Sequence, residues 1–394
     1  MRVRSSKSRV LTLAVLSALV AGALSPVRPA SAEEPRNPRG TVVSWAPLDR
    51  SLWIPETTGK AFVLTYVTMN AFGRKAHSTG TVFVPRGRAP EGGWPVVSWA
   101  HGTSGLDDSC APSRTGPALP ERDWKYLAAW MRQGYAIVAS DYAGLGTPGL
   151  HAYLDGKTTA YNVVDMVLAG RNFARRHLPR SERLARRWVT IGQSQGAGAS
   201  IYTARYATEF GGGVLDYRGA VGTGTPAYIE KYLLPIAPKV PPVPLPAGLT
   251  AYLTYIFTSL RYAHPELGID GILTPTGREY LDLAETACVF GFEEQLEGVN
   301  VGDYFTRPLA ALPNFEQTVR AYMAMPESGF DKPFFMAHGL EDTDVPIPAT
   351  LVYAGVLKAN RQPLTFKTYS TDHSGTLSTS LKDTVPFVKK LFQG

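Results

Sequence analysis

Ser194 is the residue of this chain whose surroundings point most directly to chemistry. It lies in the motif GQSQG of residues 192–196, with a glycine two residues to each side. Residues 188–191, WVTI, are strand formers, and residues 197–208 are small, aromatic and compatible with a helix. A strand that reverses into a helix so quickly leaves no room for a Cβ at the glycines, and it holds the serine hydroxyl beside free helical N–H groups. The pattern predicts a nucleophilic serine rather than an ordinary glycine-rich turn.

A serine hydroxyl becomes a good nucleophile only when a base takes its proton and an acid orients that base. In one large class of serine hydrolases the acid follows the serine along the chain, and the histidine follows the acid. Three histidines follow Ser194, namely His264, His338 and His373. His373 lies in the loop TDHSG directly after the strand-like residues 364–369, and it is the predicted base. A surface histidine in a polar loop is the alternative.

The acid is expected just beyond a strand end. Residues 334–337 form an apolar, strand-like run that leads into HGLEDTDVP of residues 338–346, a tight glycine turn with three acids. Asp342 is the predicted triad acid, with Asp344 and Glu341 as alternatives. A solvated acidic loop, or a loose Ca²⁺ site, is the other interpretation of this segment.

Ester cleavage passes through an oxyanion, which preorganised N–H donors stabilise by roughly 3–4 kcal/mol each. The backbone N–H of Gln195, the residue after the serine, is the first predicted donor. The second is the N–H of Thr103, in the loop HGTSG after the strand-like residues 95–100, where Gly102 permits close approach. His101 in the same loop is interpreted as structural, with orientation of the loop as its alternative role.

The remaining elements alternate as an open α/β sheet requires. Two β-rich runs, 61–68 and 79–84, predict an antiparallel hairpin. A strand at 94–100, a helix at 121–133 and a strand at 136–140 predict a parallel pair with a right-handed crossover. Later expected elements are a helix at 160–176, a strand near 220–222, a helix at 349–360, a strand at 364–369 and a helix from 384. The predicted fold class is α/β, with a mostly parallel sheet flanked by helices.

The character of the chain changes between residues 226 and 330. Residues 234–248 contain six prolines, which exclude a long helix or a central strand, and the apolar run 251–260 follows. We interpret 226–330 as a helical cap inserted between a first part of the sheet domain, 33–225, and a second part, 331–394. The proline-rich segment and the apolar run are expected to form a hydrophobic wall or lid over the cleft.

The first residues predict a Sec-type signal peptide. Four basic side chains precede the apolar run 10–24, and Ala30-Ser31-Ala32 follows it, so residues 1–32 are expected to be removed after Ala32 and the protein secreted. The run is shorter than the ~20 residues of a membrane span. Removal takes five of the 40 basic residues and no acidic ones, which leaves 35 basic against 33 acidic side chains. That near balance gives no indication of a nucleic-acid partner.

Cys110 and Cys288 are the only cysteines in the sequence. In an exported protein such a pair is expected to form a disulfide, and the two are too few and too far apart for a metal site. No metal or other cofactor is predicted.

Together these motifs resemble the secreted lipase family of α/β-hydrolases that includes Candida antarctica lipase A and many actinobacterial secreted esterases. The resemblance is carried by SWAHGT (98–103) with Cys110 soon after it, SDYAGLGTPG (140–149), the Ser194 motif, residues 339–346, and His373. It implies an α/β-hydrolase fold, carboxylic-ester hydrolysis, a helical cap between the serine-bearing and acid-bearing parts, and acyl chains bound in a slot shaped by the cap.

The sequence therefore predicts an exported serine esterase or lipase that acts through an acyl-enzyme and needs no cofactor. An exported serine peptidase or amidase with the same triad is one alternative, and a non-catalytic binding protein of the same fold is another. The expected partners are a small-molecule or lipid ester and, transiently, a lipid interface. No nucleic acid is expected, and the protein is predicted to be a monomer.

Overall fold

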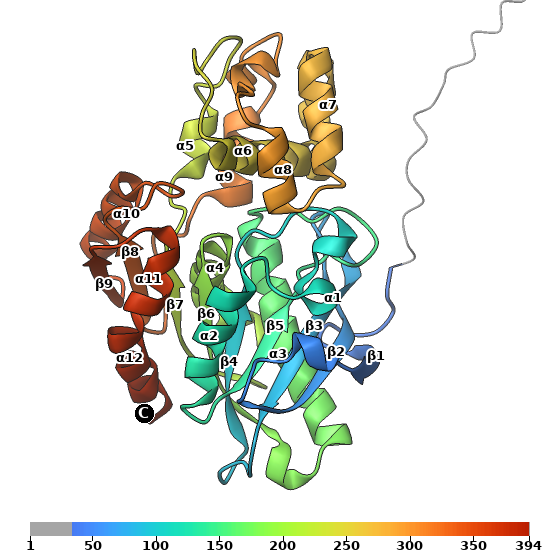
Figure 1. The fold of residues 1–394 in the computed structure, drawn as a ribbon, viewed down its shortest axis with the longest axis vertical. Coiled ribbons are helices and arrows are strands. Elements are labelled where there is room, and N and C mark those ends of the chain that lie inside the picture. Colours follow the sequence, from blue (N-terminus) through green and yellow to red (C-terminus); the bar gives the residue numbers. More distant parts are fainter. Residues whose placement is uncertain (1–33, 394) are drawn as a thin grey trace, which may run out of the picture. The chain divides into compact units, whose positions relative to one another are not determined.

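The structure is a computed structural model that describes residues 34–393. Its central element is a nine-stranded sheet. The predicted signal peptide, residues 1–32, lies outside the described residues. Across the sheet the strands follow the order β1-β2-β3-β5-β4-β6-β7-β8-β9 (Figure 1). Their bounds are β1 (Val42–Pro47), β2 (Thr58–Met69), β3 (Lys75–Pro85), β4 (Trp94–Ala100), β5 (Ala136–Ser140), β6 (Leu184–Gln193), β7 (Asp216–Thr223), β8 (Phe334–Gly339) and β9 (Leu364–Tyr369).

Most of the sheet is parallel. The antiparallel pairs are β1 with β2, β2 with β3, and β3 with β5. From β5 across to β9 every neighbouring pair is parallel. The predicted hairpin corresponds to β2 and β3, and the predicted parallel pair to β4 and β5. The α/β class with a mostly parallel sheet is confirmed.

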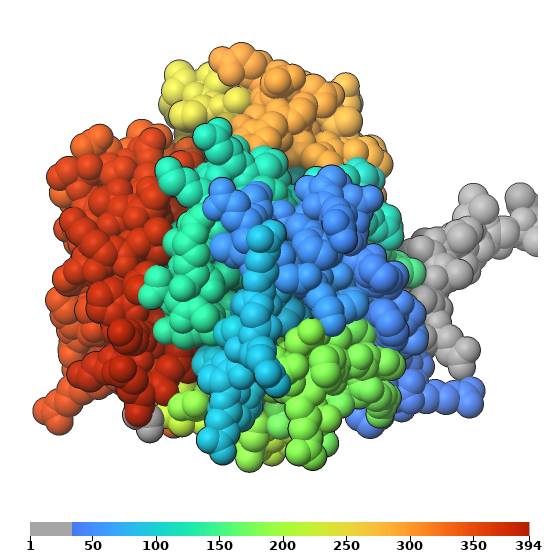
Figure 2. Space-filling model, turned by 60° about the horizontal axis from the view of Figure 1, so that its bottom comes forward, coloured from blue at the N-terminus to red at the C-terminus, as the bar shows by residue number. Residues whose placement is uncertain are grey.

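Helices cover both faces of the sheet. Successive residues of a strand point to opposite faces, so neighbouring residues pack against different helices. Val96 of β4 packs in the cluster beneath α3 (Gly156–His177), α4 (Gln195–Phe210) and α10 (Ile347–Ala359). The next residue, Val97, packs in the cluster on the other face, beneath α2 (Pro120–Met131), α11 (His373–Thr379) and α12 (Leu381–Gln393). Figure 2 shows the C-terminal segment with α11 and α12, in red, packed beside α2.

Between β7 and β8 the chain leaves the sheet and forms a helical cap with its own apolar core (Figure 1). Tyr255, Phe257 and Phe292 are fully buried in this core. None of the helices between residues 34 and 393 is long and apolar enough to cross a membrane. The helices of the cap are α5 (Ile229–Leu233), α6 (Ala247–Ala263), α7 (Pro275–Ala284), α8 (Val289–Gln295) and α9 (Phe315–Met323).

A disulfide joins the cap to the sheet domain. Cys110 lies two residues before α1 (Pro112–Thr115), and Cys288 lies directly before α8. The two are joined by a disulfide, as predicted. Two backbone bonds lie beside it: Val289 N–H donates to the Ser104 carbonyl (2.9 Å), and Leu106 N–H donates to the Ala287 carbonyl (3.4 Å). The loop after β4 is therefore fastened to α8 by covalent and hydrogen bonds.

Candidate active site

Ser194 lies at the turn between β6, which ends at Gln193, and α4, which begins at Gln195. Its backbone has φ 59° and ψ −123°, a conformation that costs a non-glycine residue free energy and is found at functional turns. Two bonds hold it there: the Ser194 N–H donates to the Thr223 carbonyl (2.9 Å), and the Ser194 carbonyl accepts from the Ala197 N–H (2.8 Å). The turn thus has the geometry expected of a nucleophile elbow.

The two glycines of the motif are required by close backbone contacts. A Cβ on Gly192 would overlap the carbonyl oxygen of Gly196, and a Cβ on Gly196 would overlap the carbonyl oxygen of Ala100 at the end of β4. The start of α4 therefore packs directly against the neighbouring strand, which brings the serine next to the loop that follows β4.

Gly196→Ala is expected to lower the free energy of unfolding by about 3 kcal/mol, because the backbone of β4 cannot move aside for the added methyl group. Gly355→Ala is the matched control. Its Cβ would meet nothing within 4 Å on α10, so the better helix propensity of alanine should raise the free energy of unfolding by about 0.5–1 kcal/mol. Urea unfolding followed by circular dichroism measures both changes. An unchanged urea midpoint for Gly196→Ala would contradict the close packing.

The structure brings Asp342 and His373 together, although they are 31 residues apart in sequence. His373 Nδ1 lies 2.7 Å from Asp342 Oδ2. The other carboxylate oxygen, Oδ1, accepts from the backbone N–H groups of Val345 (2.7 Å) and Asp344 (3.1 Å). Both oxygens of the buried carboxylate are occupied, so its orientation toward the imidazole is fixed by the turn itself.

His373 is the first residue of α11, and Asp372 caps that helix by accepting from the Gly375 N–H (2.6 Å). Only 6% of His373 is exposed. Its Nε2 atom is buried and has no hydrogen-bond partner among the described residues, and the ring lines the same cavity as Ser194. One imidazole nitrogen is therefore held by the acid, while the other has no partner among the described residues and belongs to a ring that lines the same cavity as the serine.

The sequence patterns did not indicate His338 as a site residue, yet its ring contacts the acid. Its Nε2 lies 2.8 Å from the Val345 carbonyl and 3.3 Å from Asp342 Oδ2. Burial lowers the pKa of His338, which favours the neutral ring and a bond donated to the acid loop. Its place at the end of β8, four residues before Asp342, was the only sequence signal for this contact.

The two alternative acids occupy other positions. Asp344 lines the cavity from the loop that carries Asp342, and Glu341 is exposed. As for the Ca²⁺ interpretation, no group of three or more His, Cys, Asp or Glu side chains within residues 34–393 is arranged to hold a metal ion.

The two predicted oxyanion donors lie on adjoining segments. Gln195 is the first residue of α4, and the first N–H groups of a helix have no partner within it. Thr103 lies in the loop after β4 and lines the cavity, as does Gly102. His101, the first residue of this loop, is buried. Its Nδ1 lies 2.7 Å from the Gly102 carbonyl, and its ring stacks on Tyr142. These contacts are compatible with the structural role predicted for His101 and with its alternative role in orienting the loop.

The cavity next to Ser194 has a volume of about 420 Å³. The cap contributes Gly248 and Tyr252 from α6, and Phe290 and Glu293 from α8. The expectation that the whole proline-rich segment forms the wall is wrong, since only Gly248 of residues 234–248 reaches the cavity. The cap side of the wall comes from α6 and α8 instead.

Charged side chains lie along the cavity wall. Arg122 Nε is 2.8 Å from Asp123 Oδ1, and Arg122 also donates to Ser374 Oγ (3.1 Å). Burial raises the pKa of Asp123, and the adjacent guanidinium opposes that effect. Burial, and then the nearby carboxylate of Asp344, raise the pKa of Glu293. The cavity is therefore not a purely apolar slot.

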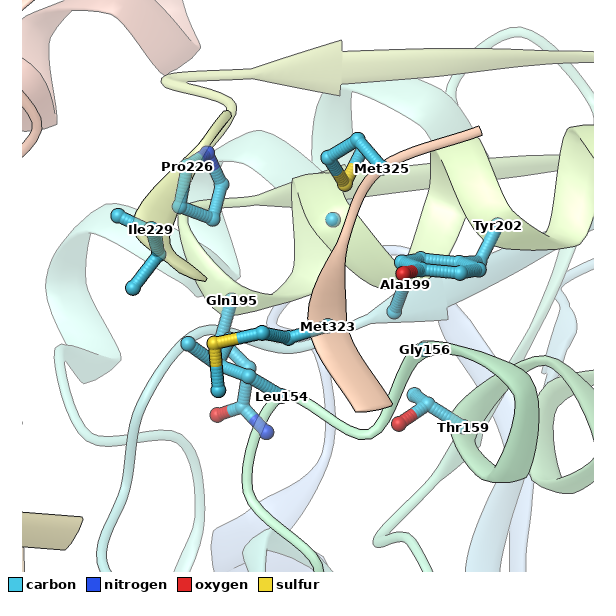
Figure 3. A pocket seen from close by; sticks show the side chains of 11 residues that line it. Leu154, Gly156, Thr159, Gln195, Ala199, Tyr202, Pro226, Ile229, Met323 and Met325 are labelled. Atoms are coloured by element: carbon cyan, nitrogen blue, oxygen red, sulfur yellow. The ribbon is translucent and has the colours of Figure 1, made fainter. Parts of the chain in front are cut away.

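A second, much smaller pocket lies along α4, with a volume of about 20 Å³ (Figure 3). Gln195, Ala199 and Tyr202, which share one face of α4, line it together with Met323 and Met325 from the end of the cap. Gln195 lines this pocket and not the large cavity. Its side chain is thus directed away from the cleft that Ser194 faces.

Comparison with solved structures gives close matches to this architecture. Candida antarctica lipase A in its closed state superposes with a TM-score of 0.69 at 20% identity, covering 92% of this chain and 85% of the lipase. The rice cell wall degrading esterase LipA from Xanthomonas oryzae gives a TM-score of 0.69 at 18% identity, covering 89% of this chain and 98% of the esterase. The chain has the α/β-hydrolase fold.

At these identities the likeness shows the fold alone. No family model matches the sequence, and no curated protein matches it either. The fold places the three candidate residues at one edge of the sheet. Ser194, Asp342 and His373 follow strands β6, β8 and β9, whose carboxyl ends lie at that edge.

Proposed function

We propose that the protein is a serine carboxylic-ester hydrolase, an esterase or lipase, with Ser194, His373 and Asp342 as its catalytic triad. The observation that supports this most strongly is the 2.7 Å bond between His373 and a fixed Asp342 carboxylate, beside a cavity that Ser194 also lines. The lipase and esterase among the structural neighbours agree with the proposal.

In the proposed reaction, His373 Nε2 takes the proton of the Ser194 hydroxyl while the serine oxygen attacks the ester carbonyl. Asp342 keeps the proton of the imidazole on Nδ1 and stabilises the imidazolium that forms. The backbone N–H groups of Gln195 and Thr103 hold the oxyanion. His373 then gives its proton to the departing alcohol, which leaves an acyl-enzyme on Ser194, and water repeats the same steps to release the acid.

The remaining parts of the proposal concern where the enzyme works. We propose that it is exported, on the basis of residues 1–32, and that it acts as a monomer on small-molecule or lipid esters, with transient contact to a lipid interface. Phe290, which lines the cavity and is 45% exposed, offers an apolar side chain at its edge.

A fluorophosphonate probe tests the proposal directly. The mature protein is treated with one equivalent of the probe, digested, and analysed by mass spectrometry, while hydrolysis of p-nitrophenyl butyrate is followed in parallel. We expect one adduct, on Ser194, and loss of ester hydrolysis in proportion to labelling. Ester hydrolysis that persists after complete labelling, or an adduct on another residue, would refute the assignment.

A further inference from the structure

Residues 151–153 lie between β5 and α3 and contact both segments of the oxyanion hole. We propose that this segment, through the side chains of His151 and Tyr153, positions the two backbone donors on Gln195 and Thr103. The inference rests on the proposed function, since it assigns a role within the same site. Neither side chain lines the large cavity, so both are positioning residues rather than catalytic ones.

The first contact runs from His151 to Gln195. Gln195 Nε2 lies 2.8 Å from His151 Nε2, and because an amide nitrogen can only donate, the imidazole nitrogen accepts. His151 is 2% exposed, and burial lowers its pKa to about 3, so the ring stays neutral and keeps this acceptor. The Gln195 side chain points into the small pocket of Figure 3, so the bond holds the residue from the side away from the cavity.

The second contact runs from Tyr153 to Thr103. The Tyr153 hydroxyl lies 2.6 Å from Thr103 Oγ1, and Tyr153 is buried. Thr103 lines the cavity and Tyr153 does not, so this bond restrains a residue of the cavity wall from outside the cavity. Two residues of one short segment thereby restrain the two donors, which are 92 positions apart in sequence.

The cap holds this segment in place. Ser259 Oγ, on α6, donates to the His151 carbonyl (3.0 Å) and accepts from the Tyr153 N–H (3.2 Å). Ser259 is fully buried. One serine of the cap therefore fixes the backbone on both sides of Ala152, and the position of α6 is transmitted to both oxyanion donors.

A stack of three rings provides a further connection. The His151 ring stacks on Tyr142, with centroids 5.4 Å apart, and Tyr142 stacks on His101, with centroids 4.4 Å apart. The Tyr142 hydroxyl also donates to the His101 carbonyl (3.1 Å), directly before the loop that carries Thr103. Replacing His151 by another aromatic ring would keep this stack and remove the bond to Gln195, together with the hydrogen bond of the imidazole to the backbone of Ala143.

The test uses His151→Phe, which removes the acceptor, and Tyr153→Phe, which removes the hydroxyl. Tyr304→Phe is the matched control, because the Tyr304 hydroxyl is also buried and bonded to a threonine, Thr254 (3.2 Å), within the cap. For each variant, kcat and KM for p-nitrophenyl butyrate and the Ki of an alkyl trifluoromethyl ketone, which forms a tetrahedral adduct, are measured in the mature protein.

His151→Phe and Tyr153→Phe are each expected to lower kcat about tenfold, less than the loss of a whole oxyanion donor, with KM changed less than twofold. The Ki should rise by the same factor as kcat falls, because both report binding of the oxyanion. His151→Gln, which restores an acceptor, should recover most of kcat. Tyr304→Phe should match the wild type.

Effects confined to KM, equal losses in Tyr304→Phe, or unchanged kcat and Ki in Tyr153→Phe would overturn the inference. Tyr153→Phe and His151→Gln keep the test decisive if His151→Phe does not fold. Failure of the proposed function gives a different result, since the wild type itself would then show no ester turnover and no adduct on Ser194.

Discussion

Ser194→Ala is expected to lower kcat for p-nitrophenyl butyrate by about 10⁵- to 10⁶-fold, to a rate at which only the oxyanion donors and substrate binding contribute. The methyl group of alanine cannot form the acyl-enzyme. The turn should keep its conformation in the variant, because the bonds of residue 194 to Thr223 and Ala197 involve the backbone alone. Initial rates at saturating ester, corrected for spontaneous hydrolysis, measure the effect.

Ser374→Ala is the control for this variant. Ser374 also lines the cavity, but its hydroxyl accepts from Arg122 and does not lie at the turn between β6 and α4. Its loss should change kcat only a few-fold. Retention of more than a few per cent of the wild-type rate in Ser194→Ala would exclude this serine as the nucleophile.

Asp342→Asn is expected to lower kcat by about 10⁴-fold while the protein stays folded. An asparagine fits the same turn, but its amide no longer carries the charge that stabilises the imidazolium, and its NH₂ group favours the wrong tautomer of His373. Circular dichroism and the thermal midpoint establish the fold, and initial rates across pH 6–9 establish the loss.

Glu341→Gln and Asp344→Asn distinguish Asp342 from its neighbours in the same loop. Glu341 is exposed, so its variant should have wild-type activity. Asp344 donates its backbone N–H to Asp342, a contact that the side-chain change leaves intact, so its variant should lose only a few-fold. If Asp344→Asn lost more activity than Asp342→Asn, the acid would be assigned to the wrong residue.

Local patterns were sufficient where the structure depends on neighbouring residues. The strand predicted at 364–369 is β9, and the frame around Ser194 follows from strand formers, glycines and a helix-compatible run over fewer than thirty residues. The chain order of serine, acid and histidine led to Asp342 and His373, because only His373 follows the acid loop. These inferences needed no knowledge of distant contacts.

Other features left little or no local signal. Strand β1, VVSWAP, was not predicted, and it lies at the edge of the sheet with most of its residues exposed despite their apolar character. Helix α11 begins at His373 within a polar sequence that is typical of a loop, and the cap provided by Asp372 was not recognised. The bond between His151 and Gln195 joins residues 44 positions apart, where neither periodicity nor spacing predicts a contact.

Under the proposed function, the charges along the cavity wall have a consequence for the release of product. Ester hydrolysis turns an uncharged molecule into an acid that ionises at neutral pH. Glu293 and Asp344 line the cavity with carboxyl groups, whereas the charges of Arg122 and Asp123 offset each other as an ion pair. Wherever Glu293 and Asp344 are ionised they repel the carboxylate product of the proposed reaction, whereas the uncharged ester is not repelled. We therefore expect the proposed enzyme to resist inhibition by its own acid product.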